Sequence, residues 1–152
     1  MAAGYSGTPL PQKLGIKAGS RVAVVGAPQD FDALEPLPDR VRLRVQARGA
    51  QDVVLFFATR RAELERRFDS FARTIHPAGG LWIAWPKKTA CVATDLTENL
   101  VREVGLAHGL VDNKVCAVDD IWSGLRFVYR LNDRARNASA PAARRANTAS
   151  RR

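Results

Sequence analysis

The chain has no long apolar run and no leader-like beginning. Its 152 residues contain no stretch of about 18 apolar side chains, the length that a membrane-spanning helix needs. The first residues, Met1–Gly7, do not show a positive charge followed by an apolar segment, which is the pattern of a secretory signal. We therefore expect a cytoplasmic protein with no membrane-bound part.

Cysteine and histidine are scarce. Two cysteines cannot build a disulfide framework, and with only two histidines the chain offers no obvious ligand set, so no metal site is expected. Cys116 lies in an apolar run and is expected to be a small buried thiol. Cys91 lies in a polar segment near Lys87 and Lys88, whose charges favour a thiolate, so a reactive thiol is the alternative there.

Acidic residues are absent from residues 134–152. This segment holds six of the 24 lysines and arginines: Arg134, Arg136, Arg144, Arg145, Arg151 and Arg152. Residues 133–152 have too few apolar side chains to form a core, so they are predicted to be a disordered tail. Such a tail attracts nucleic acid or another polyanion without sequence specificity, although it has no aromatic residues for stacking on bases. A purely solubilising tail is the equal alternative.

What remains is an N-terminal arm at residues 1–19 and one α/β domain at residues 20–132. Short apolar runs predict strands at 21–26, 41–45, 52–58, 80–85, 115–118 and 125–131. Helical periodicity predicts helices at 60–75 and 96–104, with one or two turns at 29–37. Strands that alternate with helices indicate a mainly parallel sheet in a three-layer fold. The short connection between the last two strands indicates an antiparallel hairpin.

Several local features refine this arrangement. The second strand alternates with Arg42 and Arg44, which is typical of a half-exposed strand toward an edge of the sheet. Thr59 precedes the helix at 60–75 and is predicted to cap it. Asp95, with Glu98 three residues later, forms a pattern like a capping box at the start of the next helix.

Two segments carry a family resemblance. Leu14–Gly26 resembles the lead-in and first strand of the class I methyltransferase fold, a Rossmann-like sheet whose last strand is antiparallel. His76–Leu81, with one proline and two glycines, resembles the turn before a later strand of that fold. The whole chain also resembles an uncharacterised family of small bacterial proteins, abundant in actinobacteria, in Trp85–Lys88, Thr94–Glu98 and Val111–Val115. This second resemblance implies no established activity.

The cofactor loop of the methyltransferase family is reduced in this chain. Only Gly26 of its glycines remains, and Pro28 stands where another glycine is expected. Val24 occupies the place of an acidic residue in the first strand. The stretch Val41–Arg48 has no acid to bind the hydroxyls of a ribose. No G-x-G-x-x-G occurs for a dinucleotide. No cofactor is therefore expected.

Ligands of such sheets bind beyond the carboxyl ends of the parallel strands. That edge should collect four candidate residues: Gly26, Gln29, Asp30 and Thr59. The loop after the strand at 80–85 offers a candidate anion site made of Lys87, Lys88 and Thr89. Ammonium groups near the start of a helix can hold a phosphate or a carboxylate. A solvated basic loop is the alternative for this segment.

Trp122 lies in the connection of the predicted hairpin, an unusual place for a large aromatic residue. It either folds back as a lid on the core or marks a surface for a protein partner or for self-association. Together these observations favour a non-catalytic binding or interaction module on a degenerate methyltransferase-like fold, rather than an enzyme. One alternative is an enzyme with a modified cofactor or anion pocket, similar to methyltransferases that use S-adenosylmethionine (SAM). A nucleic-acid-associated protein acting through its basic tail is the other.

Overall fold

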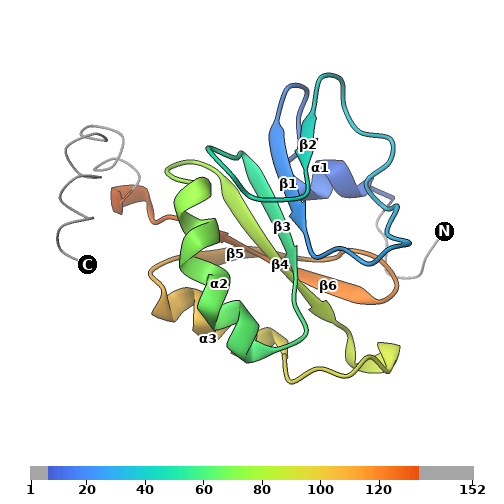
Figure 1. Ribbon diagram of the computed structural model, residues 1–152, viewed down its shortest axis with the longest axis vertical. Coiled ribbons are helices and arrows are strands. Elements are labelled where there is room, and N and C mark those ends of the chain that lie inside the picture. Colours follow the sequence, from blue (N-terminus) through green and yellow to red (C-terminus); the bar gives the residue numbers. More distant parts are fainter. Residues whose placement is uncertain (1–6, 134–152) are drawn as a thin grey trace.

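A computed structural model of the chain describes residues 7–133. They form one six-stranded sheet with the strand order β2-β1-β3-β4-β6-β5 (Figure 1). The strands are β1 Arg21–Val25, β2 Arg42–Arg44, β3 Val53–Phe57, β4 Gly80–Pro86, β5 Val111–Ala117 and β6 Trp122–Val128. Strands β1 to β4 pair in parallel, and β6 is antiparallel to both β4 and β5. The predicted mainly parallel, Rossmann-like sheet with a C-terminal antiparallel hairpin is confirmed.

The centre of the sheet consists of strands that are apolar on both faces. Every residue of β3 and β4 is buried, as expected for strands covered on both sides. Trp82 and Trp85 belong to opposite faces of β4, because Trp82 packs in one core cluster and Trp85 in the other. All three residues of β2 are exposed, and this strand ends the sheet, which confirms the predicted edge.

Two helices, α2 (Arg61–Thr74) and α3 (Glu98–Ala107), cover one face of the sheet (Figure 1). The predicted apolar stripe of α2 is confirmed, since Leu64, Phe68, Phe71 and Ile75 are all buried. On α3, Gly105 lies against the ring of Phe127 so closely that a β-carbon would stand 2.0 Å from Phe127 Cε1. The absence of a side chain therefore lets α3 pack directly on β6.

The other face of the sheet carries little helix. It is covered by the short helix α1 (Leu10–Leu14) and by the loop between β1 and β2. The helix predicted at 29–37 is wrong: this segment forms turns and bends. Prolines break its helical pattern, and its apolar side chains pack on the sheet without a helix. Residues 10–16 of the predicted arm pack there too, and Trp82 Nε1 donates a hydrogen bond to the carbonyl of Leu14 at 3.1 Å.

The helix starts differ from the predicted caps. Arg60 is the N-cap of α2 and offers no side-chain hydrogen bond, so the cap predicted for Thr59 is wrong. Asp95 accepts the hydrogen bond from the backbone N–H of Arg61 instead, at 2.7 Å. The cap of α3 is Thr97, whose Oγ1 accepts from the N–H of Leu100 at 3.2 Å. Each acceptor satisfies a donor that the first helical turn leaves free.

Three further predictions concern membrane-spanning helices, metal sites and the C-terminal tail. Within residues 7–133, no helix is long and apolar enough to cross a membrane, and no group of three or more potential ligands is placed to hold a metal ion. The tail at 134–152, with its six arginines, lies outside the described residues.

Candidate functional site

The carboxyl ends of the parallel strands meet at one edge of the sheet. Gly26, Thr59 and Lys87 follow β1, β3 and β4 there. The turn between β5 and β6 reaches the same edge, because Trp122 pairs with Pro86 and the N–H of Lys87 donates to the carbonyl of Ile121 at 2.8 Å. This edge therefore gathers the loops of four strands, as the fold class predicts for a ligand site.

Gly26 makes the turn out of β1. Its φ of +75° lies in the left-handed region, which side chains rarely adopt. A β-carbon at this position would stand 3.1 Å from the carbonyl oxygen of Phe57 on the neighbouring strand. The position therefore requires glycine for two independent reasons.

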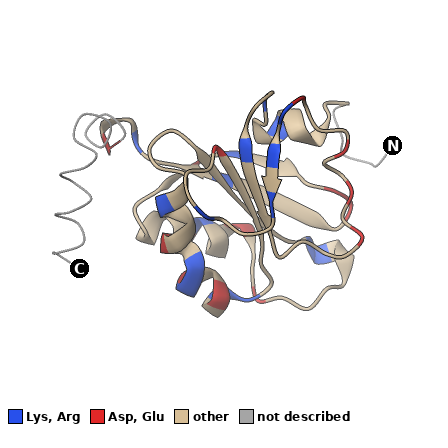
Figure 2. Cartoon of the chain, turned by 45° about the horizontal axis from the view of Figure 1, so that its top comes forward, with Lys and Arg blue, Asp and Glu red and all other residues tan. Residues whose placement is uncertain are grey.

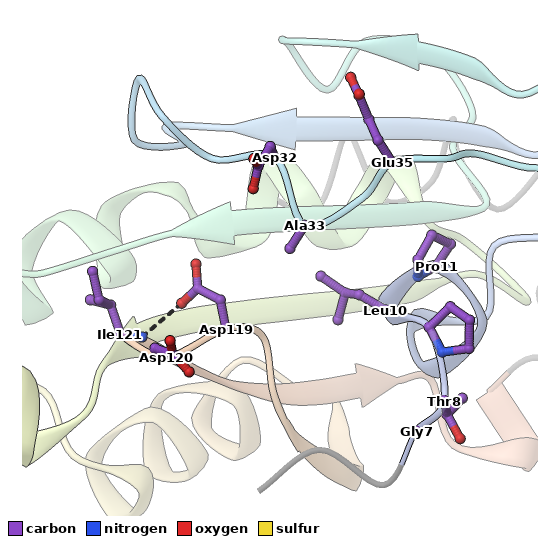
Figure 3. A pocket seen from close by; sticks show the side chains of 11 residues that line it. Gly7, Thr8, Leu10, Pro11, Asp32, Ala33, Glu35, Asp119, Asp120 and Ile121 are labelled. Atoms are coloured by element: carbon purple, nitrogen blue, oxygen red, sulfur yellow. Dashed lines mark hydrogen bonds between the residues drawn. The ribbon is translucent and has the colours of Figure 1, made fainter. Parts of the chain in front are cut away.

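A cavity of about 550 Å³ opens beside this edge, on the face of the sheet that α1 covers. Three segments line it: residues 7–11, residues 32–35 of the loop after β1, and residues 119–121 of the turn between β5 and β6. Figure 3 shows Asp32 and Asp119 extending toward one another from two of these segments. We name this space the acidic cavity, because its lining contains Asp32, Glu35, Asp119 and Asp120 but no lysine or arginine.

The carboxylates of the acidic cavity differ in role. Asp119 Oδ1 accepts hydrogen bonds from the backbone N–H groups of Ile121 at 2.9 Å and Trp122 at 2.8 Å, so it fixes the turn. Asp32, Glu35 and Asp120 all line the cavity and are exposed to solvent. Four carboxylates without a basic neighbour in the lining create a negative potential, which favours a positively charged group.

The four candidates of the carboxyl edge lie near the acidic cavity in the fold but do not line it. Gly26, Gln29 and Asp30 belong to the turn that leads into its loop. Thr59 has a main-chain role: its carbonyl accepts from Thr94 Oγ1 at 2.7 Å and from the N–H of Asp95 at 3.3 Å. Their contact with a ligand remains a prediction.

The candidate anion site at Lys87, Lys88 and Thr89 forms a short 3-10 turn, η1 (Lys88–Ala90). Lys88 and Thr89 are exposed, and Lys87 is half-buried. Cys91 follows this turn and is exposed as well. These three residues do not belong to the lining of the acidic cavity, and anion binding by them remains a prediction.

Trp122 is buried rather than displayed. It is 7% exposed, belongs to the core on the α1 face and meets the ring of Phe57 edge-on, with 5.0 Å between the ring centroids. This placement favours the lid that folds back on the core over the partner surface. Its position also joins the turn between β5 and β6 to the end of β3.

Sequence reasoning missed the acidic cavity. Its three segments are far apart in the chain and meet only through the order of the strands. The one local signal was the pair Asp119–Asp120 in the hairpin connection, next to a tryptophan that turned out to be buried.

Comparison with solved structures places this fold among methyltransferases. The chain is similar to magnesium protoporphyrin IX methyltransferase of Synechocystis with bound SAM, at 12% identity and a TM-score of 0.54 over 74% of this chain and 71% of that one. It is similar to a SAM-dependent methyltransferase of Aquifex aeolicus, at 16% identity and a TM-score of 0.53 over 76% and 85%. It is also similar to precorrin-6y C5,15-methyltransferase of Geobacter metallireducens, at 12% identity and a TM-score of 0.52 over 80% and 86%. No family model and no curated protein matches the chain.

These likenesses show a class I methyltransferase-like fold. They also correct the functional expectation. The three neighbours described above are methyltransferases, which contradicts the prediction of a non-catalytic binding module and the leaning away from an enzyme. The findings favour the alternative of an enzyme with a modified cofactor pocket. The error arose because missing glycines and a missing acid were given more weight than the architecture that remains.

Proposed function

We propose that this chain is a methyltransferase that binds SAM at the carboxyl edge of its sheet. The observation that carries the proposal is the acidic cavity, lined in part by the loop that follows the Gly26 turn, in a fold whose solved neighbours include an enzyme with bound SAM. The location agrees with the general rule that ligands of open α/β sheets bind outside the carboxyl ends of the strands.

The residues present fit this cofactor in two respects. Gly26 gives the main chain the left-handed turn that leads from β1 into the loop lining the acidic cavity, and main chain without a side chain can approach a nucleoside closely. SAM carries a positive sulfonium and an ammonium group, and the carboxylates of the acidic cavity attract positive charge. Asp32 and Glu35 are the groups that would bind this charge, while Asp119 holds the turn that completes the wall.

One part of the site differs from the family pattern. No acid follows β2, where an acidic residue would bind the hydroxyls of a ribose: the strand ends at Arg44, and Val45 and Gln46 come next. Specificity for the nucleoside therefore rests on other groups of this chain. When bound, SAM would supply an activated methyl group. Its transfer converts the positive sulfonium into a neutral thioether, so the negative environment of the acidic cavity would attract SAM before the transfer and hold the product less strongly.

Calorimetric titration tests the proposal. We expect the full chain to bind SAM with a Kd below about 100 μM, a binding free energy of roughly 5.5 kcal/mol. The Asp32→Asn/Glu35→Gln variant should bind SAM at least tenfold more weakly. It should lose less affinity for S-adenosylhomocysteine, which lacks the sulfonium charge. No heat of binding up to millimolar SAM would overturn the proposal.

A control variant removes a single carboxylate outside the acidic cavity. Asp39 is exposed and lies in the same loop between β1 and β2, but it does not line the acidic cavity. Asp39→Asn should leave the affinity for SAM within about twofold. An equal loss in Asp39→Asn would mean that overall charge, and not the acidic cavity, governs binding.

We also propose a family membership, a cellular location and binding partners that the sequence suggests. Membership in the uncharacterised bacterial family is supported by Trp85–Lys88, Thr94–Glu98 and Val111–Val115. A cytoplasmic location agrees with the absence of a membrane-spanning helix among the described residues. A partner protein, self-association, and binding of nucleic acid by the arginines of residues 134–152, which lie outside the described residues, are further proposals.

A further inference from the structure

The amino edge of the sheet, opposite the acidic cavity, has the reverse charge. A hollow of about 690 Å³ opens there between the segment after α1, the start of β1 and the turn after α2. Its lining contains five cationic side chains and a single carboxylate, that of Asp52. The cations are Lys13, Lys17, Arg21, Lys114 and Arg126.

A second hollow of about 530 Å³ continues the first. The two share Gly19 and Arg21, and the second adds Arg40 and Arg42. Arg21 and Arg42 are register partners on the parallel strands β1 and β2. Figure 2 shows the blue segments of these two strands side by side. The hollows therefore form one cationic track along the amino edge, which ends at the exposed strand β2.

The positive charge of the track is only partly compensated. Asp52 accepts a hydrogen bond from the backbone N–H of Arg21 at 2.8 Å and forms an ion pair with its Nε at 3.6 Å. Within residues 7–133, no salt bridge involves Lys17, Arg40 or Arg42, and the side chains of all three are exposed. The track thus keeps a positive potential that steers an anion toward it.

We propose that this cationic track binds the phosphodiester backbone of a nucleic acid. Arginine presents a planar fork of donors that matches a phosphate, and three arginines lie on adjacent positions of the track. Two connected hollows fit a ligand with repeated charges better than one isolated phosphate. The described lining of both hollows contains no Phe, Tyr or Trp, so binding contacts the backbone and does not stack bases.

The cationic track differs from the C-terminal arginines and from the proposed SAM site. Its cations belong to residues 13–126, so it does not include the C-terminal arginines, and it does not depend on SAM binding at the opposite edge. An anionic membrane is a poorer match, because the cations of the track line hollows rather than a flat surface.

The test compares two triple variants of the full chain, each lacking three exposed cations. The first, Lys17→Gln/Arg40→Gln/Arg42→Gln, neutralises the track. The second, Arg60→Gln/Arg66→Gln/Arg73→Gln, neutralises the same charge on and beside α2. Binding to fluorescent duplex DNA and duplex RNA is measured against salt concentration. The plot of log K against log salt has a negative slope, and each lost phosphate contact should reduce the magnitude of this slope by about 0.9. We expect the magnitude of the slope to be smaller by about 2 to 3 in the first variant than in the unmodified chain.

The second variant should keep the slope of the unmodified chain. Equal losses in both variants, or no loss in the first, would overturn the proposal and assign binding to overall charge or to the tail. Vesicles with anionic lipid are a third probe: if the first variant loses vesicle binding while nucleic-acid binding is unchanged, the surface serves a membrane and the proposal fails. Thermal unfolding of both variants shows whether they remain folded, as expected for exposed side chains.

Discussion

The side chain of Asp95 accepts a hydrogen bond from the backbone N–H of Arg61, with 2.7 Å between Oδ1 and N. The loop before α3 therefore caps the start of α2, 34 residues earlier in the chain. Thr94 strengthens the link, because its Oγ1 donates to the carbonyl of Thr59 at 2.7 Å. The starts of both helices are thus tied together at the carboxyl edge of the sheet.

Replacing Asp95 with alanine should remove this cap. We expect Asp95→Ala to lower the free energy of unfolding by about 1 kcal/mol, within the usual range for a lost cap. Hydrogen exchange should show reduced protection of the first amides of α2, whereas the amides of α3 keep theirs because Thr97 caps that helix. Loss of protection at α3 instead would mean that Asp95 caps its own helix.

The contact between Gly105 and Phe127 leaves no room for a side chain. In Gly105→Ala the new β-carbon would overlap the ring of Phe127, so α3 or the ring must move. We expect a loss of about 1 to 3 kcal/mol in urea denaturation, the usual cost of overpacking. Adding Phe127→Leu should recover part of this loss. If Gly105→Ala is as stable as the original chain, α3 does not pack on β6 in this way.

Trp82 connects the sheet to α1 through its indole N–H. Trp82→Phe removes the hydrogen bond to Leu14 and leaves a buried carbonyl unpaired, which should cost about 1 to 3 kcal/mol. Hydrogen exchange at residues 10–16 should accelerate more than exchange in α2. Trp85→Phe on the opposite face is the matched control, and it should leave exchange in α1 unchanged.

The two cysteines should differ in reactivity. Burial raises the pKa of the Cys116 thiol, and the nearby charge of Lys13 opposes this shift only in part. Cys91 is exposed. At pH 8, a thiol reagent should modify the Cys116→Ser variant, which keeps Cys91, much faster than the Cys91→Ser variant. Equal rates in the folded protein would contradict the burial of Cys116.

The raised pKa of Cys116 also predicts a pH dependence of stability. Because the folded state holds the thiol proton more tightly than the unfolded state, stability is fully present below the ordinary pKa of 9.0 and declines as pH rises toward the folded value. Cys116→Ala should flatten this decline in denaturant titrations above pH 9. The phenol of Tyr129, whose pKa burial also raises, contributes to the same decline.

The sequence predicted those elements of the fold that depend on a local pattern of residues. Val53–Phe57 is apolar without interruption and became a central strand, and the stripe that begins at Leu64 became the buried face of α2. The capping partner of Asp95 was not predictable, because it depends on how two distant segments meet. The helix expected at 29–37 failed because its apolar residues could reach the sheet from an irregular loop between prolines.

The acidic cavity and the cationic track could not be predicted from the sequence for the same reason. Asp32 and Asp119 face one cavity only because their loops follow strands of one sheet. Arg21 and Arg42 become neighbours only through the parallel pairing of β1 with β2. Strand order, which single-sequence patterns do not encode, therefore separates the acidic edge from the basic edge.

Amide chemical shifts recorded during a titration with SAM test the proposed cofactor site most directly. Saturable shifts should be largest at Ala33 and the turn around Asp119, which line the acidic cavity, and at Gly26, whose turn leads into the loop that lines it. Shifts confined to the amino edge near Lys17, or none at millimolar SAM, would contradict a cofactor site at the carboxyl edge.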